Sequence, residues 1–211
     1  MLQILDFLGK VVKISKINLI LRVHNLEPYF SWRNLYSSED DPRSPFYGNE
    51  HNEFYFMEKI YDHYIHPQWD SMGSSTLFLK ILFVDYDDGY AFIELIGEWN
   101  DILYNDIMFL KREIGDRLIS DGIDKFILIG ENVLNFHAGD DCYYEEWLED
   151  IENGWVVLLN FREHVLSEFR QANLANYFTL WDEFNDLSWR TYRPLQLFQK
   201  IQQYVLKRVS A

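Results

Sequence analysis

The chain has 211 residues, of which 48% are hydrophobic and 25% are charged, proportions that are ordinary for a globular protein. This composition excludes a largely disordered chain, a collagen and a coiled-coil rod. The 19 Lys and Arg residues are outnumbered by 34 Asp and Glu residues, which gives a formal charge of -15. Because phosphate groups are bound by cationic side chains, this charge argues against nucleic acid and anionic membranes as partners.

The expected compartment follows from one cysteine and from the first residues. Cys142 is the only cysteine, so an internal disulfide and an all-cysteine zinc site are both excluded. Residues 1–6 have neither the basic segment nor the small-residue cleavage site of a signal peptide. No apolar run approaches the ~20 residues that span a bilayer. We therefore predict a cytoplasmic protein that does not enter a membrane.

Residues 1–76 are predicted to form an N-terminal extension or subdomain. Over residues 1–36 the apolar positions fit a strand and a helix equally well. Polar stretches at 37–45 and 71–75 predict exposed loops. Between them, apolar residues at helical spacing predict a helix over 54–66 that ends at Pro67. Its apolar residues are Phe54, Met57, Ile60, Tyr61 and Tyr64.

Residues 77–211 are predicted to form an α/β domain with a C-terminal helical part. It begins with two strands, 77–86 and 90–96, joined by a tight turn at Asp88-Gly89. Asn100 or Asp101 is predicted to cap the next helix, which should end at Gly122. The stripe that this helix is expected to bury is Leu103, Ile107, Leu110, Ile114 and Leu118.

Strands and helices alternate in the rest of the domain. Continuous apolar runs predict strands at 126–129 and 155–161 that are covered on both faces. Helices are predicted to start at Asp140 or Asp141, at Glu163 and at Pro194. The fold class is therefore α/β, with a mixed sheet in the order hairpin, helix, strand, helix, strand, helix, plus N-terminal and C-terminal extensions.

The element order over residues 77–174, together with the stretch Ile93-Glu94-Leu95-Ile96-Gly97-Glu98-Trp99, resembles the STAS family of sulfate transporter and anti-sigma-factor antagonist domains. In that family the first helix ends at a short turn, here Asp121-Gly122, before an apolar strand. The resemblance implies a non-catalytic interaction or sensing module. STAS regulators carry a phosphorylatable Ser or Thr at the start of the next helix, whereas the corresponding residues 135–142 include neither.

Two histidines offer a candidate metal site. His63 and His66 are three residues apart, so on the predicted helix both rings would share a face and could reach one metal ion. The alternative is a pair of ordinary histidines, and this is the interpretation that we favour. The sequence contains no phosphate-binding loop, dinucleotide fingerprint, nucleophile elbow or zincin motif, so we predict no cofactor and no metal.

The densest polar cluster, residues 137–146, allows two interpretations. In a hydrolase or transferase, Cys142 would be the nucleophile and His137 and Asp141 its partners, beyond a parallel strand and at a helix N-terminus that lowers a thiol pKa. In a structural interpretation, Asp141 caps the helix, Glu145 complements its dipole and Cys142 packs as a small apolar residue. We favour the structural interpretation.

The function predicted from these features is a non-catalytic protein-interaction or regulatory module with an acidic surface and a basic protein partner. The residues expected on the partner surface are Glu145, Glu149, Trp181 and Trp189. The enzyme that uses residues 137–146 is the alternative, and an acidic inhibitor or immunity-type protein is the second alternative.

Overall fold

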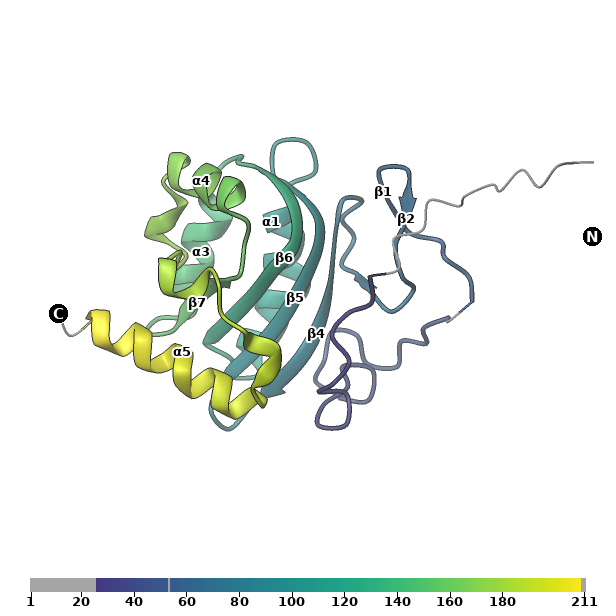
Figure 1. Ribbon diagram of the computed structural model, residues 1–211, viewed down its shortest axis with the longest axis horizontal. Helices are drawn as coiled ribbons and strands as arrows, with labels where there is room; N and C mark the ends of the chain where they lie inside the picture. Colours follow the sequence, from purple (N-terminus) through teal and green to yellow (C-terminus); the bar gives the residue numbers. More distant parts are fainter. Residues whose placement is uncertain (1–25, 53, 210–211) are drawn as a thin grey trace, which may run out of the picture.

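The computed structural model describes residues 26–52 and 54–209, and its centre is a five-stranded mixed sheet (Figure 1). The two outer pairs at one edge are antiparallel, and the last three strands are parallel. This confirms the predicted α/β class with a hairpin followed by alternating helices and strands. In spatial order the strands are β3 (Asp70–Ser71), β4 (Leu77–Asp85), β5 (Tyr90–Asn100), β6 (Lys125–His137) and β7 (Trp155–Leu159).

The β4–β5 hairpin forms where the Asp88-Gly89 pair predicts it. Gly89 has a φ of 69°, a left-handed conformation that glycine adopts without strain. The Asp85 carboxylate accepts hydrogen bonds from the backbone N–H groups of Asp87 and Asp88, at 3.1 and 3.0 Å. The turn is thus held by local interactions, and for this reason the sequence predicts it correctly.

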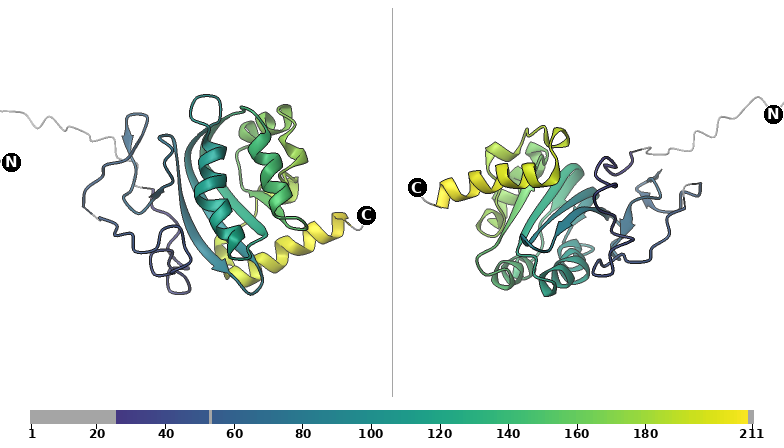
Figure 2. Two further views of the ribbon diagram at one scale, coloured as in Figure 1. Left: turned by 180° about the vertical axis from the view of Figure 1, so that it is seen from behind. Right: turned by 90° about the horizontal axis from the view of Figure 1, so that it is seen from below.

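One face of the sheet is covered by the helices that connect the parallel strands and by the helix that follows the last strand (Figure 2). Residues 106–120 are continuously helical, with a π-helical segment, η1, in the middle. Buried side chains from all of these helices join the strands in one apolar cluster. The helices are α1 (Asp106–Phe109), η1 (Leu110–Gly115), α2 (Asp116–Ser120), α3 (Cys142–Asp150) and α4 (Glu163–Gln171).

The second face is covered by segments from both ends of the chain. Helix α5 (Pro194–Val209) lies across it, as the right view in Figure 2 shows. Phe198 and Ile201 of α5 pack on the sheet together with Trp32 and Trp189. Towards the carboxyl end of β5, a hairpin of β1 (Lys59–Ile60) and β2 (His63–Tyr64) adds a smaller apolar cluster.

The helix predicted over 54–66 is wrong. The chain forms the β1–β2 hairpin there, and Tyr61 at its turn has a φ of 52°. Of the predicted apolar stripe only Ile60 is buried, whereas Phe54 and Met57 are exposed. The helical spacing is coincidental, because pairing within the hairpin and contact of Ile60 with the sheet decide the local conformation.

The helix after β5 begins later than predicted. Strand β5 continues to Asn100, and α1 starts at Asp106, so Leu103 lies in a loop and is exposed. The other four residues of the predicted stripe are buried. The predicted end is confirmed, since Gly122 has a φ of 93° and its N–H donates to the Ile119 carbonyl at 2.9 Å. The uncertainty between strand and helix over residues 1–25 lies outside the described residues.

Strand β6 is three times longer than the apolar run that predicts it. The run at 126–129 continues through Asn132 and Asn135 to His137, which pairs with Asn100 of β5. The second half of β6 contains polar residues, so the apolar pattern of the sequence does not predict it as a strand. Because β6 extends past β7, its end and the end of β5 form a projecting edge of the sheet (Figure 1).

The described part of the N-terminal region is held to the sheet by Trp32. Its ring is 3% exposed, lies edge-on to Phe92 at 5.2 Å and donates a hydrogen bond to the Tyr192 carbonyl at 3.1 Å. We expect Trp32→Ala to lower the free energy of unfolding by about 3–5 kcal/mol, measured by urea denaturation. The control is Phe30→Ala, since Phe30 is 68% exposed. Equal effects of both variants would contradict this arrangement.

Candidate functional site

The projecting ends of β5 and β6 carry a polar contact that joins three elements. The Glu98 carboxylate of β5 lies 2.8 Å from Nε2 of His137 in β6 and accepts a hydrogen bond from the Tyr61 hydroxyl at 2.6 Å. The hydrogen bond to Glu98 raises the pKa of Tyr61. Glu98 therefore holds the tip of the β1–β2 hairpin against the carboxyl ends of two parallel strands, the edge at which open α/β sheets bind ligands.

The loop from β5 to α1 is fixed at its beginning by Asp101, which is almost fully buried. Its carboxylate accepts hydrogen bonds from the Trp99 indole at 3.0 Å, the Ile107 N–H at 2.8 Å and the Tyr144 hydroxyl at 2.6 Å. Burial raises the pKa of Asp101 to about 6, and these hydrogen bonds limit the rise. A buried carboxylate with three donors fixes the backbone on both sides of the loop.

Asp106 fixes the other end of the same loop. Its carboxylate accepts hydrogen bonds from the Ser74 hydroxyl at 2.5 Å, the Thr76 hydroxyl at 3.0 Å and the Asn100 N–H at 2.7 Å. Burial also raises the pKa of Asp106. Asn105, directly before it, is left-handed with a φ of 54°, which turns the chain into the helix.

Between these two anchors lie three large, mainly apolar side chains and Asn105, which is partly exposed. Ile102, Leu103 and Tyr104 are 66%, 72% and 43% exposed, and we call them the apolar loop. The Leu103 N–H donates to the Asn100 side chain at 3.0 Å, so the backbone of the loop is ordered as well. Three consecutive exposed apolar residues on a fixed backbone are typical of a surface that binds another molecule.

The structure does not assemble His137, Asp141 and Cys142 into one site. His137 pairs with Glu98, Asp141 accepts a hydrogen bond from Tyr177, and Cys142 contacts Asp140. Among the described residues, no hydrogen bond joins any two of the three. Asp141 is the N-cap residue by position, but the side chain that accepts the Cys142 N–H is that of Asp140, at 2.9 Å.

Cys142 is exposed, and its surroundings disfavour the thiolate. Its contact with Asp140 raises the pKa of the thiol, because a nearby carboxylate repels the negative charge of a thiolate. We expect iodoacetamide at pH 7.5 to alkylate Cys142 several-fold more slowly than free cysteine, and Asp140→Asn to speed the reaction. Mass spectrometry of timed samples measures both rates. Alkylation faster than that of free cysteine would support the enzyme alternative.

The two histidines proposed as metal ligands lie on different elements. His63 is exposed in β2, whereas the His66 ring is half-buried and lies 3.5 Å from the Glu27 carboxylate. The helix face that would bring them together does not exist. Within residues 26–52 and 54–209, no group of three or more His, Cys, Asp or Glu side chains could hold a metal ion.

For one of the four residues expected on a partner surface, the prediction of exposure is wrong. Trp189 is fully buried and packs against Tyr29 and Trp32. Its indole N–H donates to the Glu131 carboxylate at 2.9 Å. Trp181 and Trp189 therefore do not form an exposed pair of aromatic side chains. Trp181 is half-buried, stacked on Phe184. Glu145 and Glu149 are exposed on α3 as expected.

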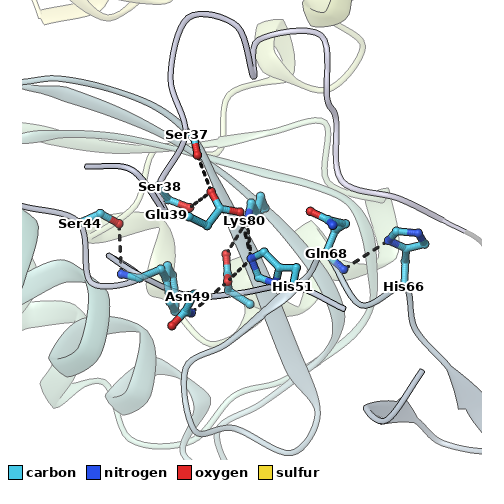
Figure 3. A network of polar contacts seen from close by, with 11 residues as sticks. Ser37, Ser38, Glu39, Ser44, Asn49, His51, His66, Gln68 and Lys80 are labelled. Carbon is cyan, nitrogen blue, oxygen red and sulfur yellow. Dashed lines mark hydrogen bonds and ion pairs between the residues drawn. The ribbon is translucent and has the colours of Figure 1, made fainter. Parts of the chain in front are cut away.

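A second polar cluster, which the sequence analysis missed, ties the N-terminal segment to the sheet (Figure 3). Lys80 of β4 lies 2.5 Å from Glu39 and 3.0 Å from Asp70, and His51 lies 3.0 Å from Glu39 and 3.2 Å from Asp70. The hydroxyls of Ser37 and Ser38 also donate to Glu39. We call Glu39, His51, Asp70 and Lys80 the lysine cluster. The residues come from distant parts of the chain, so no sequence motif could have predicted the cluster.

The lysine cluster is arranged for stability rather than for catalysis. Hydrogen bonds to Asp70 and Glu39 raise the pKa of His51 to about 9. Burial alone would raise the pKa of Glu39, but hydrogen bonds from His51 and Lys80 hold it well below its usual range. Two basic side chains thus face two carboxylates, and Nζ of Lys80 also lies 3.0 Å from Nε2 of His51. A protonated His51 is no general base, and a Lys80 paired with two carboxylates is no nucleophile.

The raised pKa of His51 predicts a pH dependence of stability. The stabilisation is complete below the unfolded value of about 6.5 and is lost as the pH rises through 9. We expect the stability difference between the wild type and His51→Gln to shrink by on the order of 2 kcal/mol between pH 6 and pH 9.5. Urea denaturation at both values measures it. His63→Gln, which removes an exposed histidine, should show no such change.

Comparisons with known proteins add no relative. No family profile, curated protein or solved structure matches the chain. Among the described residues, no helix has the length and apolar character required to cross a membrane.

Proposed function

We propose that the protein is a non-catalytic protein-interaction module and that the apolar loop is the centre of its binding surface. The observation that carries this proposal is the pair of buried carboxylates, Asp101 and Asp106, that fix the two ends of an exposed apolar tip. A loop held in one conformation loses little entropy when it binds, and apolar side chains supply most of the energy at the centre of an interface.

The alternative of a hydrolase or transferase at residues 137–146 has less support. A nucleophilic thiol is activated by a base within hydrogen-bond reach or by a lowered pKa. Cys142 has neither, since His137 pairs with Glu98 and the pKa of the thiol is raised. The lysine cluster offers no catalytic group either, because its basic side chains are paired with its carboxylates.

The charge around the apolar loop indicates the chemistry of the partner. Gly139 lies directly against Asp101, which brings the exposed Asp140 and Asp141 to the side of the loop. The whole chain carries a charge of -15. The partner that fits is a protein with an apolar groove and a basic rim, and we place the interaction in the cytoplasm.

The STAS resemblance stays a prediction and agrees with this proposal. A STAS-like module recognises a partner without catalysis, and residues 135–142 offer no hydroxyl for a regulatory phosphate. We therefore propose that recognition depends on the shape of the loop and on its apolar surface rather than on phosphorylation.

The proposal is tested by replacing Leu103 with a photo-crosslinking amino acid and identifying the protein that it captures in cells. The same residue placed at Leu195, which is exposed on α5, is the matched control. The captured protein is then purified and its affinity is measured by calorimetry. We expect Leu103→Ser to weaken binding about tenfold or more, and Leu195→Ser to leave it unchanged.

Both positions are exposed, so neither serine variant should alter the thermal unfolding temperature, and this checks that any loss is local. Identical adducts from positions 103 and 195 would contradict the proposal. So would equal affinity of the Leu103→Ser variant and the wild type for the purified partner.

A further inference from the structure

A cavity of about 250 Å³ lies between the β1–β2 hairpin and the carboxyl-terminal halves of β5 and β6. Its walls are mainly apolar. Ile60 and Ile65 contribute from the hairpin side, and Ile96 and Leu134 from the sheet. None of the three residues of the apolar loop lines it, so it is a separate feature of the surface.

Besides Tyr61, whose hydroxyl is bonded to Glu98, three polar side chains line this cavity. Arg162 follows β7, Asn132 belongs to β6 and His63 belongs to β2. They come from three elements far apart in the sequence, and all are placed at the carboxyl-end edge of the parallel strands. A few convergent polar groups on apolar walls are the usual composition of a small-molecule site.

Among the described residues, these three side chains make one hydrogen bond to the rest of the structure. Arg162 donates only through Nε, to the Glu131 carbonyl at 3.3 Å. Among the described residues, no carboxylate lies within 4.0 Å of its guanidinium group, although the chain has 34 Asp and Glu residues. Within the same residues, the side chains of Asn132 and His63 have no hydrogen-bond partner. The cavity thus presents unused donors, one of them a full positive charge.

We propose that this cavity binds a compact apolar carboxylate, whose hydrocarbon body contacts the three isoleucines and whose carboxylate pairs with Arg162. A guanidinium group matches a carboxylate in a bidentate geometry. An apolar cavity of about 150 Å³ accepts benzene, so this one suits a molecule of roughly ten non-hydrogen atoms. A phosphate dianion fits less well, because a single arginine beside apolar walls leaves half of its charge without a partner.

The test uses benzoate and hexanoate, with benzamide and hexanamide as uncharged counterparts of the same shape, and inorganic phosphate as the competing anion. Binding is followed by titration calorimetry and by the rise in thermal unfolding temperature. We expect both carboxylates to bind at millimolar concentration and both amides to bind about tenfold more weakly or worse. Phosphate should not bind.

Variants assign the binding to the cavity. Arg162→Gln should weaken carboxylate binding about tenfold or more while leaving the weak amide binding unchanged. Arg117→Gln removes an exposed arginine of α2 that is remote from the cavity, and should have no effect. Leu134→Trp, which fills the cavity, should abolish binding of carboxylates and amides alike. Circular dichroism checks the fold of each variant.

Three results would overturn the proposal. The first is no binding of either carboxylate at millimolar concentration. The second is unchanged carboxylate affinity in Arg162→Gln or in Leu134→Trp. The third is phosphate binding that equals or exceeds carboxylate binding. Each of these leaves the proposed role of the apolar loop untouched, because Leu103 and its neighbours lie outside the cavity.

Discussion

The structure depends on the burial of strand β5 on both of its faces. Every residue of β5 is buried, and its apolar side chains belong to the cluster under the helices, to the cluster under α5 and to the smaller cluster at the β1–β2 hairpin. The connecting helices can cover one face only, because right-handed crossovers between β5, β6 and β7 place them on the same side. The other face must therefore be covered by α5 and by segments from the N-terminal region, which explains why Trp32 and Trp189 meet over Phe92.

This second cover brings charged groups into the interior and requires each of them to be paired. Glu94 of β5 is buried beneath the N-terminal segment, and burial raises its pKa to about 7. The Tyr29 N–H donates to it at 2.7 Å, and Arg190 lies 3.5 Å away while also pairing with Glu131. The lysine cluster does the same for the neighbouring strand β4. Some of the carboxylates thus join distant segments of the chain.

The loop that follows the carboxyl end of β5 has a backbone fixed by hydrogen bonds and apolar side chains that are exposed. Asp101 and Asp106 are buried and hold a loop whose own apolar side chains remain exposed. This exposed apolar tip on a fixed backbone is the feature on which the proposed binding role rests. The cavity beside the β1–β2 hairpin lies at the same ends of β5 and β6. Two of the polar side chains that line it, Asn132 and His63, have no hydrogen-bond partner among the described residues.

The sequence by itself determined the α/β class, the β4–β5 turn and the end of the helix at Gly122, because these depend on local periodicity and backbone preference. It also indicated the edge of the sheet at which polar residues gather. Only the tertiary structure decided that residues 59–64 form a hairpin, that Leu103 is exposed and that Trp189 is buried. Spacing along the chain fits a helix, a strand or a loop equally in such short segments. Glu39 and Lys80 are about 40 positions apart, and Trp32 and Trp189 more than 150, and no local pattern encodes contacts between such distant residues.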